Sequence, residues 1–289
     1  MKRVGRYVAL TLGWLLLVAY FTYLRFPYAQ VRSLIEPRLA TLGIGALSFD
    51  GLEATALGGL RLTGVSWTPM GWSPTQAIEV EQVDLAPAYL KLLRRARAVR
   101  FDAKLFGGRA HGTAAVTAEL RTQVTASLDE LDLAQATLPS LPAGASGSVS
   151  GKIDLDIGNG VEGSKGAIHL EASDGEIPPI NSNGMKIPPS PLKFAKAELD
   201  VTVDGPKVDI NSLTVKGPDV EGSASGNVTM RGRSIANGPL AADVKFKLPD
   251  GSSLKAMEGL IAGFRVKKDA EGYFTLKLAG TLANPSPRL

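Results

Sequence analysis

Apolar and polar residues alternate with a period of two along much of this chain, and this pattern decides the expected fold class. Successive side chains of an extended strand point to opposite faces of a sheet, so each run places its apolar residues on one face. The clearest runs lie at 101–105, 153–157, 199–203, 244–248 and 274–278. We therefore predict a mainly β protein whose antiparallel strands form a sheet with one apolar and one polar face.

Glycine and proline separate these runs. The 289 residues include 32 glycines and 18 prolines but only 6% aromatic residues, a balance that favours strands and turns over long helices. Turns are expected at Gly107-Gly108, Gly158–Gly160, Asp204–Pro206 and Gly217–Asp219. With 44% hydrophobic and 21% charged residues, the chain has enough apolar material to fold.

An internal repeat runs through the strands. A Gly-x-x-x-Gly segment that leads into alternating residues begins at Gly108, Gly147 and Gly222, and these starts lie 39 and 75 residues apart. The spacing is close to one and two units of a single period, as in an elongated, stacked sheet. We expect a curved antiparallel sheet of degenerate repeats, in which the glycines permit bulges or strand bends.

The segment Tyr7–Leu24 contains no charged residue. A helix of roughly 17 to 20 such residues is long enough to cross the hydrocarbon core of a membrane. Lys2, Arg3 and Arg6 precede it, and positive flanks stay on the cytoplasmic side. The segment is therefore predicted to be a transmembrane helix, with the rest of the chain outside the cytoplasm.

A cleaved signal peptide is the alternative interpretation of this segment. Its apolar core is longer than a signal peptide needs, and Arg25–Tyr28 follows it without a small-residue cleavage pattern, so we favour an uncleaved anchor. The expected organisation is a cytoplasmic tail at 1–6, a transmembrane anchor at 7–24 and an exported β-rich domain at 25–289.

A few short helices are expected within the β-rich domain. Apolar residues recur with helical spacing at 30–42, 86–99 and 252–264, where Ser252 or Ser253 can cap the last helix. The helix at 86–99 is basic, so it either lies on anionic lipid or covers the sheet with a solvated basic face; we favour the second.

Two further segments connect strands. The segment Ile177–Pro191 carries five prolines and is predicted to be an extended loop that cannot pair regularly. The segment Leu138–Gly147, rich in proline, alanine and glycine, is expected to join two repeats.

The chain offers few residues for catalysis or metal binding. It has no cysteine and two histidines, His111 and His169, which lie in strand-like segments without neighbouring ligands. Asp154 and Asp156 resemble the start of a calcium loop, but Gly158 takes a ligand position, no glutamate follows at the required offset, and the segment fits a strand. Ser148, Ser150, Ser223, Ser225 and the sequon residue Asn227 are interpreted as strand residues.

These observations predict no catalytic, cofactor-binding or metal-binding residues, and hence no enzyme. The net charge is +4, and three of those charges precede the apolar segment, which leaves about +1 for the remainder. A basic footprint for nucleic acid is therefore not expected.

The layout resembles the type II secretion system protein N family and is similar to the broader AsmA-like group of envelope proteins. The likeness rests on the single anchor, the segment Val99–Gly108, the repeated glycine-rich strands and the closing segment Leu278–Pro285. The resemblance implies an anchor in the bacterial inner membrane and a periplasmic body that assists protein secretion. The AsmA-like relatives resemble lipid-transfer proteins with a curved, groove-like sheet. The family offers no catalytic residues to carry over.

Two functions follow as hypotheses. The first is a non-enzymatic accessory component of type II secretion that contacts other secretion-system envelope proteins through an edge strand or the Pro-rich loop. The second is a lipid-binding protein whose apolar sheet face lines a groove for phospholipid. The alternation alone does not separate them, because a filled core requires the same pattern as an open groove.

Overall fold

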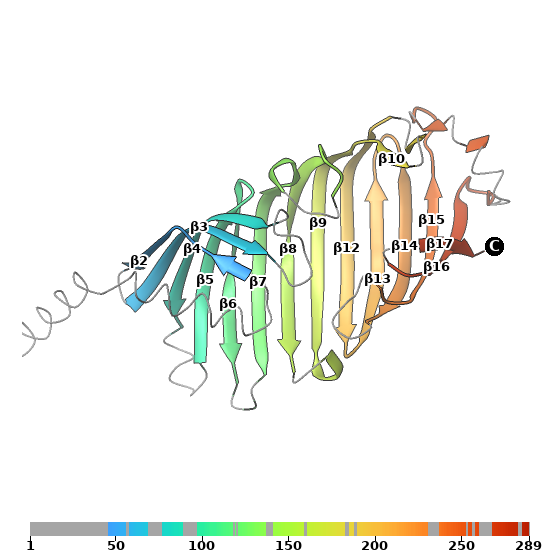
Figure 1. The fold of residues 1–289 in the computed structure, drawn as a ribbon. Coiled ribbons are helices and arrows are strands. Elements are labelled where there is room, and N and C mark those ends of the chain that lie inside the picture. Colours follow the sequence, from blue (N-terminus) through green and yellow to red (C-terminus); the bar gives the residue numbers. More distant parts are fainter. Residues whose placement is uncertain are drawn as a thin grey trace, which may run out of the picture.

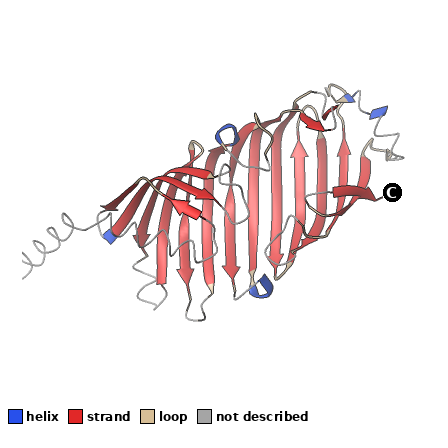
Figure 2. Ribbon diagram, in the orientation of Figure 1, coloured by secondary structure: helices blue, strands red, loops and turns tan. Residues whose placement is uncertain are grey.

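The chain folds into one open, curved antiparallel sheet with almost no helix (Figures 1 and 2). The computed structural model describes residues 46–55, 58–68, 77–88, 97–117, 119, 121–136, 141–158, 161–182, 185–187, 190–230, 237–252, 254–255, 258–259, 268–282 and 285–288. The prediction of a mainly β protein with a curved antiparallel sheet is confirmed.

The large sheet contains 15 strands, and a separate sheet contains two. The first nine strands are β1 (Ala46–Ser48), β2 (Gly51–Thr55), β3 (Gly59–Thr68), β4 (Ile78–Pro87), β5 (Arg97–Leu105), β6 (Gly108–Val116), β7 (Thr122–Asp132), β8 (Ser146–Ile157) and β9 (Lys165–Ile177). The others are β10 (Ile180–Ser182), β11 (Met185–Ile187), β12 (Leu192–Asp204), β13 (Lys207–Lys216), β14 (Glu221–Thr229), β15 (Leu240–Lys247), β16 (Phe274–Gly280) and β17 (Pro285–Arg288). Short 3-10 turns lie at Leu133–Gln135 (η3) and Val161–Gly163 (η4).

The sheet is a meander from β3 onward. Each strand pairs with the next one along the chain, except that the β10–β11 hairpin is inserted between the neighbours β9 and β12. Figure 1 shows the strands side by side across the molecule, with β2 to β4 near one end and β15 to β17 at the other. Both β1 and β2 pair with β3, so they share one outer edge of the sheet.

Tight turns connect the strands where glycine was expected. Phe106 and Gly107, between β5 and β6, have φ values of 50° and 68°. Gly205, between β12 and β13, has a φ of 60°. Such positive values are readily adopted by glycine, which lacks a Cβ atom. The predicted turns at these two places are confirmed.

The sequence repeat corresponds to one β-hairpin. Gly108, Gly147 and Gly222 lie at the starts of β6, β8 and β14. In the sheet, β8 is the second strand after β6, and β14 is the fourth strand after β8. The expectation that these glycines permit bulges holds at Gly147, where φ is 134° and the pairing register shifts. Gly112 and Gly151 instead lie in regular pairs, where an added Cβ would collide with the main chain of the next strand.

Two predictions about irregular segments are wrong in part. Ala86-Pro87 ends β4 and Arg97–Val99 begins β5, so a helix over 86–99 does not form at either end, and 89–96 lies outside the described residues. Within the Pro-rich segment, Ile180–Ser182 and Met185–Ile187 pair as a hairpin. All five prolines lie outside these two short strands, so the main-chain donors between the strands are retained.

The other predicted helical segments lie mostly outside the described residues. This applies to the tail at 1–6, the anchor at 7–24, the segment 30–42 and most of 252–264. Glu258 and Gly259 are helical, and the Ser252 hydroxyl accepts a hydrogen bond from the Leu254 amide at 3.1 Å. In the part of the chain that the structure describes, no helix is long and apolar enough to cross a membrane.

The close strand approach at Gly112 predicts a steric penalty for any side chain there. In Gly112→Ala, the new Cβ would meet the Thr125 carbonyl oxygen and the Phe101 ring. We expect this variant to lose roughly 2 kcal/mol of stability, the typical cost of overpacking, which would appear as a lower midpoint in urea unfolding of the full chain. The control is Gly251→Ala, because nothing lies within 4 Å of a Cβ at that position. Equal midpoints for the two variants would contradict the close packing of β6 on β7.

Candidate functional site: an open apolar face

One face of the large sheet carries a continuous apolar row from β2 to β16; we call it the apolar face. Residues that lie directly opposite one another on paired strands share a face. One row across 13 strands consists of Ala54, Leu60, Leu85, Phe101, Gly112, Ala126, Ile153, Ile168, Val201, Ile210, Gly226, Ala242 and Leu278. At a strand spacing of about 4.8 Å, this row is roughly 60 Å long along the curve of the sheet.

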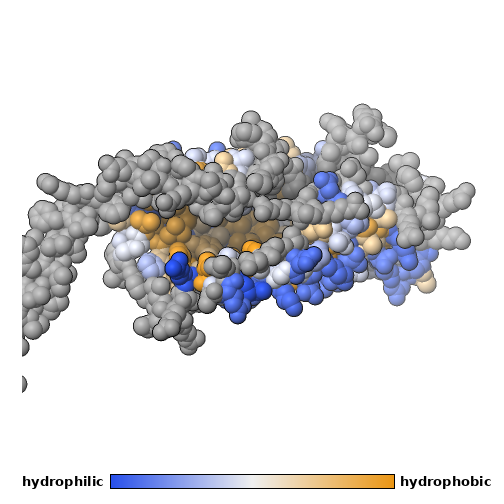
Figure 3. Space-filling model, turned by 60° about the horizontal axis from the view of Figure 1, so that its bottom comes forward, coloured by the Kyte–Doolittle hydropathy of each residue, from blue (hydrophilic) through white to orange (hydrophobic). Residues whose placement is uncertain are grey.

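The described residues leave much of this face partly exposed, although Ala126 and, towards the C-terminal strands, Val208, Val228, Leu240 and Phe274 are buried. An apolar sheet face is normally covered by a second layer of helices or strands. Here the described strands form one layer, apart from the short β10–β11 hairpin. Ile153, Ile168 and Val201 remain partly exposed, and Val99, Val116 and Ile157 are 42%, 39% and 44% exposed. Figure 3 looks into the hollow: apolar residues form the visible part of its interior, and hydrophilic residues follow the lower rim in this view.

A groove of about 510 Å³ lies on this surface where β3 to β6 meet. Apolar side chains of Leu60, Leu85, Val99 and Val116 line it. A cavity of this size falls within the range of sites for small apolar ligands. The groove is open rather than enclosed, and Leu60 and Leu85 in its lining belong to the row that crosses the sheet.

Charged residues interrupt the apolar face at the ends of the described strands: Arg97, Glu79 and Glu81 on β4 and β5, and the Glu176–Lys193 pair on β9 and β12. Arg97 lies at the start of β5, beyond Val99 and opposite Val116, and it lines the groove. Glu79 and Glu81 lie at the other end of β4, where Glu79 is opposite Ser66. Over β4 and β5 the face is therefore basic at one strand end, apolar in the middle and acidic at the other strand end.

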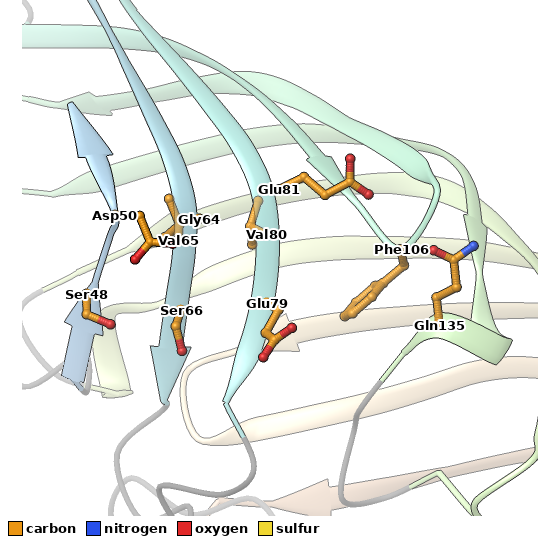
Figure 4. A pocket seen from close by; sticks show the side chains of 10 residues that line it. All are labelled: Ser48, Asp50, Gly64, Val65, Ser66, Glu79, Val80, Glu81, Phe106 and Gln135. Carbon is orange, nitrogen blue, oxygen red and sulfur yellow. The ribbon is translucent and has the colours of Figure 1, made fainter. Parts of the chain in front are cut away.

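A second cavity, of about 430 Å³, lies at the acidic end (Figure 4). Glu79 and Glu81 from β4 and Asp50 from the link between β1 and β2 line it, with Phe106 and Gln135 on the far side. In Figure 4 the side chains of Glu79 and Glu81 extend in different directions. Across the described ranges, no group of three or more possible metal ligands converges on one point.

The opposite face carries the charged residues, and many of them form ion pairs between strands. Arg61 on β3 lies 2.6 Å from Asp84 on β4, and Arg121 lies 2.8 Å from Asp156 on β8. The hydrogen bond from Arg61 lowers the pKa of the Asp84 carboxyl. We call this surface the polar face; its pairs are solvent-exposed, so each contributes little stability individually.

The candidate residues from the sequence lie on the polar face. His111 is 3.1 Å from Asp129, and Asp156 of the rejected calcium loop pairs with Arg121. Ser148 and Ser150 are in β8, and Ser223, Ser225 and Asn227 are in β14, as predicted. These residues are spread over several strands, and no site brings them together.

His169 has two carboxylate partners on the polar face. Its Nδ1 lies 2.6 Å from Asp200 and its Nε2 lies 3.2 Å from Glu171. These hydrogen bonds, the Asp200 bond first, raise the pKa of His169. The Ser212 hydroxyl donates its hydrogen bond to Asp200, at 3.1 Å, and not to the imidazole. The three residues therefore do not form a nucleophile, base and orienting acid in the order that catalysis needs.

The sequence indicated the apolar face but not the charge pattern on it. Arg97 was assigned to the basic helical stretch, whereas it is in phase with Val99 and Phe101 on β5. The extension of the period-two pattern back to residue 97 was the signal available for finding it.

The geometry defines an open, single-layer sheet with a long apolar hollow. No family model, curated protein or solved structure matches this chain.

The carboxylate pair around His169 predicts pH-dependent stability. Because the pKa of His169 is raised above its ordinary value of about 6.5, the charged imidazole stabilises the fold below that pH, and this contribution is lost as pH rises through the raised pKa. We expect His169→Gln to lower the melting temperature of the full chain by roughly 1–3 °C near pH 6 and by less near pH 9, the modest effect of an exposed pair. Thermal scans at both pH values measure this difference; the same loss at both would show that His169 does not act through its charge.

Proposed function

We propose that this chain is a non-enzymatic lipid-binding protein whose apolar face accommodates acyl chains. The observation that carries the proposal is the row of 13 apolar or glycine residues across a face that the described residues leave partly exposed. Contiguous exposed apolar surfaces of this kind mark binding sites in soluble domains.

The dimensions of the hollow support an acyl ligand. The row is roughly 60 Å long, whereas one leaflet of a bilayer holds acyl chains of about 15 Å. Each methylene that leaves water for an apolar surface contributes about 0.8 kcal/mol, so one chain gains considerably from lying on this face.

The proposed location is the bacterial inner membrane, with the sheet in the periplasm. The predicted anchor at 7–24 and the positive residues before it support this arrangement. Such a tether holds the hollow close to a lipid source. It also agrees with the likeness to AsmA-like envelope proteins.

Photo-crosslinking on the two faces of β9 tests lipid binding by the full chain in membranes. Ile168 is on the apolar face, and its neighbour Ala167 is exposed on the polar face. A benzophenone amino acid at position 168 is expected to yield adducts that carry radiolabelled acyl chains, at least about tenfold more than at position 167, because adjacent strand residues point to opposite faces. Equal or absent labelling at both positions would reject the proposal.

A second candidate function is an accessory role in type II secretion through strand addition by a partner. The two edges of the large sheet differ in a way that favours it. Strand β17 contains Pro285 and Pro287, which lack the main-chain donors that another strand needs. Strands β1 and β2 contain no proline and have no outer partner among the described strands, so they form an edge that is open to pairing.

Deletion of the gene tests the secretion role in a bacterium that encodes a type II system. The expected result is a lower amount of secreted exoproteins, restored by the wild-type chain but not by a chain in which Leu47→Pro removes a donor from β1. Normal secretion in the deletion strain would contradict this role. It would leave lipid binding unaffected, since that function rests on the apolar face.

A further inference from the structure

We propose that Arg97 binds the anionic headgroup of a phospholipid whose acyl chains occupy the groove on β3 to β6. This inference rests on the proposed lipid-binding function and adds the charge and orientation of the ligand. Arg97 is the basic side chain that lines the groove, whereas Lys193, which is in phase with Val201 on β12, lies at the opposite strand end and pairs with Glu176. It is exposed and lines the groove.

The position of Arg97 suits a headgroup at the mouth of an apolar site. Its cross-strand neighbour is Val116, and Thr122 and Ile157 continue this row along the rim. The next row inward contains Pro87 and Val99. A guanidinium at this place is able to contact a headgroup in water while the attached chains lie over the apolar rows, which is the usual division of an amphiphile between polar and apolar surroundings.

Arg97 is available for an external anion. Among the described residues it has no ion-pair partner, in contrast to Arg61, Arg109 and Arg121, which are paired with Asp84, Asp102 and Asp156. The chain has no acidic residue from 85 to 101, whereas it has five basic ones there. The local charge therefore complements an anion.

The guanidinium also favours phosphate on chemical grounds. Its planar array of donors makes paired hydrogen bonds with phosphate oxygens, and these charge-assisted bonds are stronger than neutral ones. A phosphatidylglycerol headgroup offers this phosphate together with net negative charge. A phosphatidylethanolamine headgroup offers the phosphate with a compensating ammonium group.

The acidic end of the face fixes the orientation of the ligand. Glu79 lies eight residues from Pro87 on β4, roughly 26 Å along the strand. Glu79 and Glu81 repel an anionic headgroup at that end, and Arg97 attracts it at the other. The lipid is therefore oriented with its headgroup at the β4–β5 rim and its chains directed over Leu85 and Phe101.

Headgroup analysis of crosslinked lipid in the full chain tests this assignment. A benzophenone amino acid at Val116, opposite Arg97, captures lipid from bacterial membranes that contain phosphatidylglycerol and phosphatidylethanolamine, and mass spectrometry identifies the headgroups. We expect phosphatidylglycerol to be enriched over its share of the membrane. Arg97→Gln should reduce this enrichment by about three- to tenfold, the usual effect of losing a charge-assisted hydrogen bond at a partly exposed site. Arg97→Glu should favour phosphatidylethanolamine, and Arg97→Lys should retain part of the preference.

Arg100→Gln is the matched control, because Arg100 lies three residues along β5 on the polar face. It is expected to leave both the yield and the headgroup composition unchanged. Identical headgroup compositions for the wild type and Arg97→Gln, with normal total yield, would overturn the role of Arg97 and retain lipid binding. Absence of lipid adducts at both 116 and 168 would overturn the proposed function and this inference together.

Discussion

Main-chain hydrogen bonding between sequential antiparallel strands is the constraint on which the rest of this structure depends. Most globular domains add a large buried core to such ladders. In the described part of this chain, the largest fully buried side chains are Phe49, Phe274 and Val228. The sheet therefore relies on its ladders and on contacts between directly opposed side chains more than on a second layer.

The polar face and the apolar face of the sheet have different roles. On the polar face, ion pairs such as Arg61 with Asp84 and His169 with Asp200 join residues in the same register across neighbouring strands. A slip of one residue would separate these partners and would also move the polar side chains onto the apolar face. The charged network thus specifies register, even though each exposed pair adds little stability. The apolar face therefore does not have to pack against a second layer to fix the register of the strands.

Local patterns predicted the strands well, because residue alternation and turn glycines act over a few residues. They failed at 86–99, where apolar residues satisfied helical spacing although strand pairing extends to Pro87 and resumes at Arg97. They also missed the β10–β11 hairpin. The five prolines were counted over the whole Pro-rich segment, although residues 180–187 contain none. Whether the apolar face is covered depends on the number of layers, which no local pattern records. The place of Arg97 in the groove depends equally on pairing with Val116, which is distant in sequence.

The correspondence between the sequence repeat and one hairpin has a consequence for how the hollow changes in size. Adding or removing a unit of about 39 residues inserts or deletes two strands with the same orientation as those they join. The faces stay in phase, so the cross-section of the hollow is preserved while its length changes by about 10 Å per unit. Under the proposed lipid-binding function, the capacity of such a sheet would be a property of chain length, whereas its chemical selectivity would depend on the few charged residues near one end.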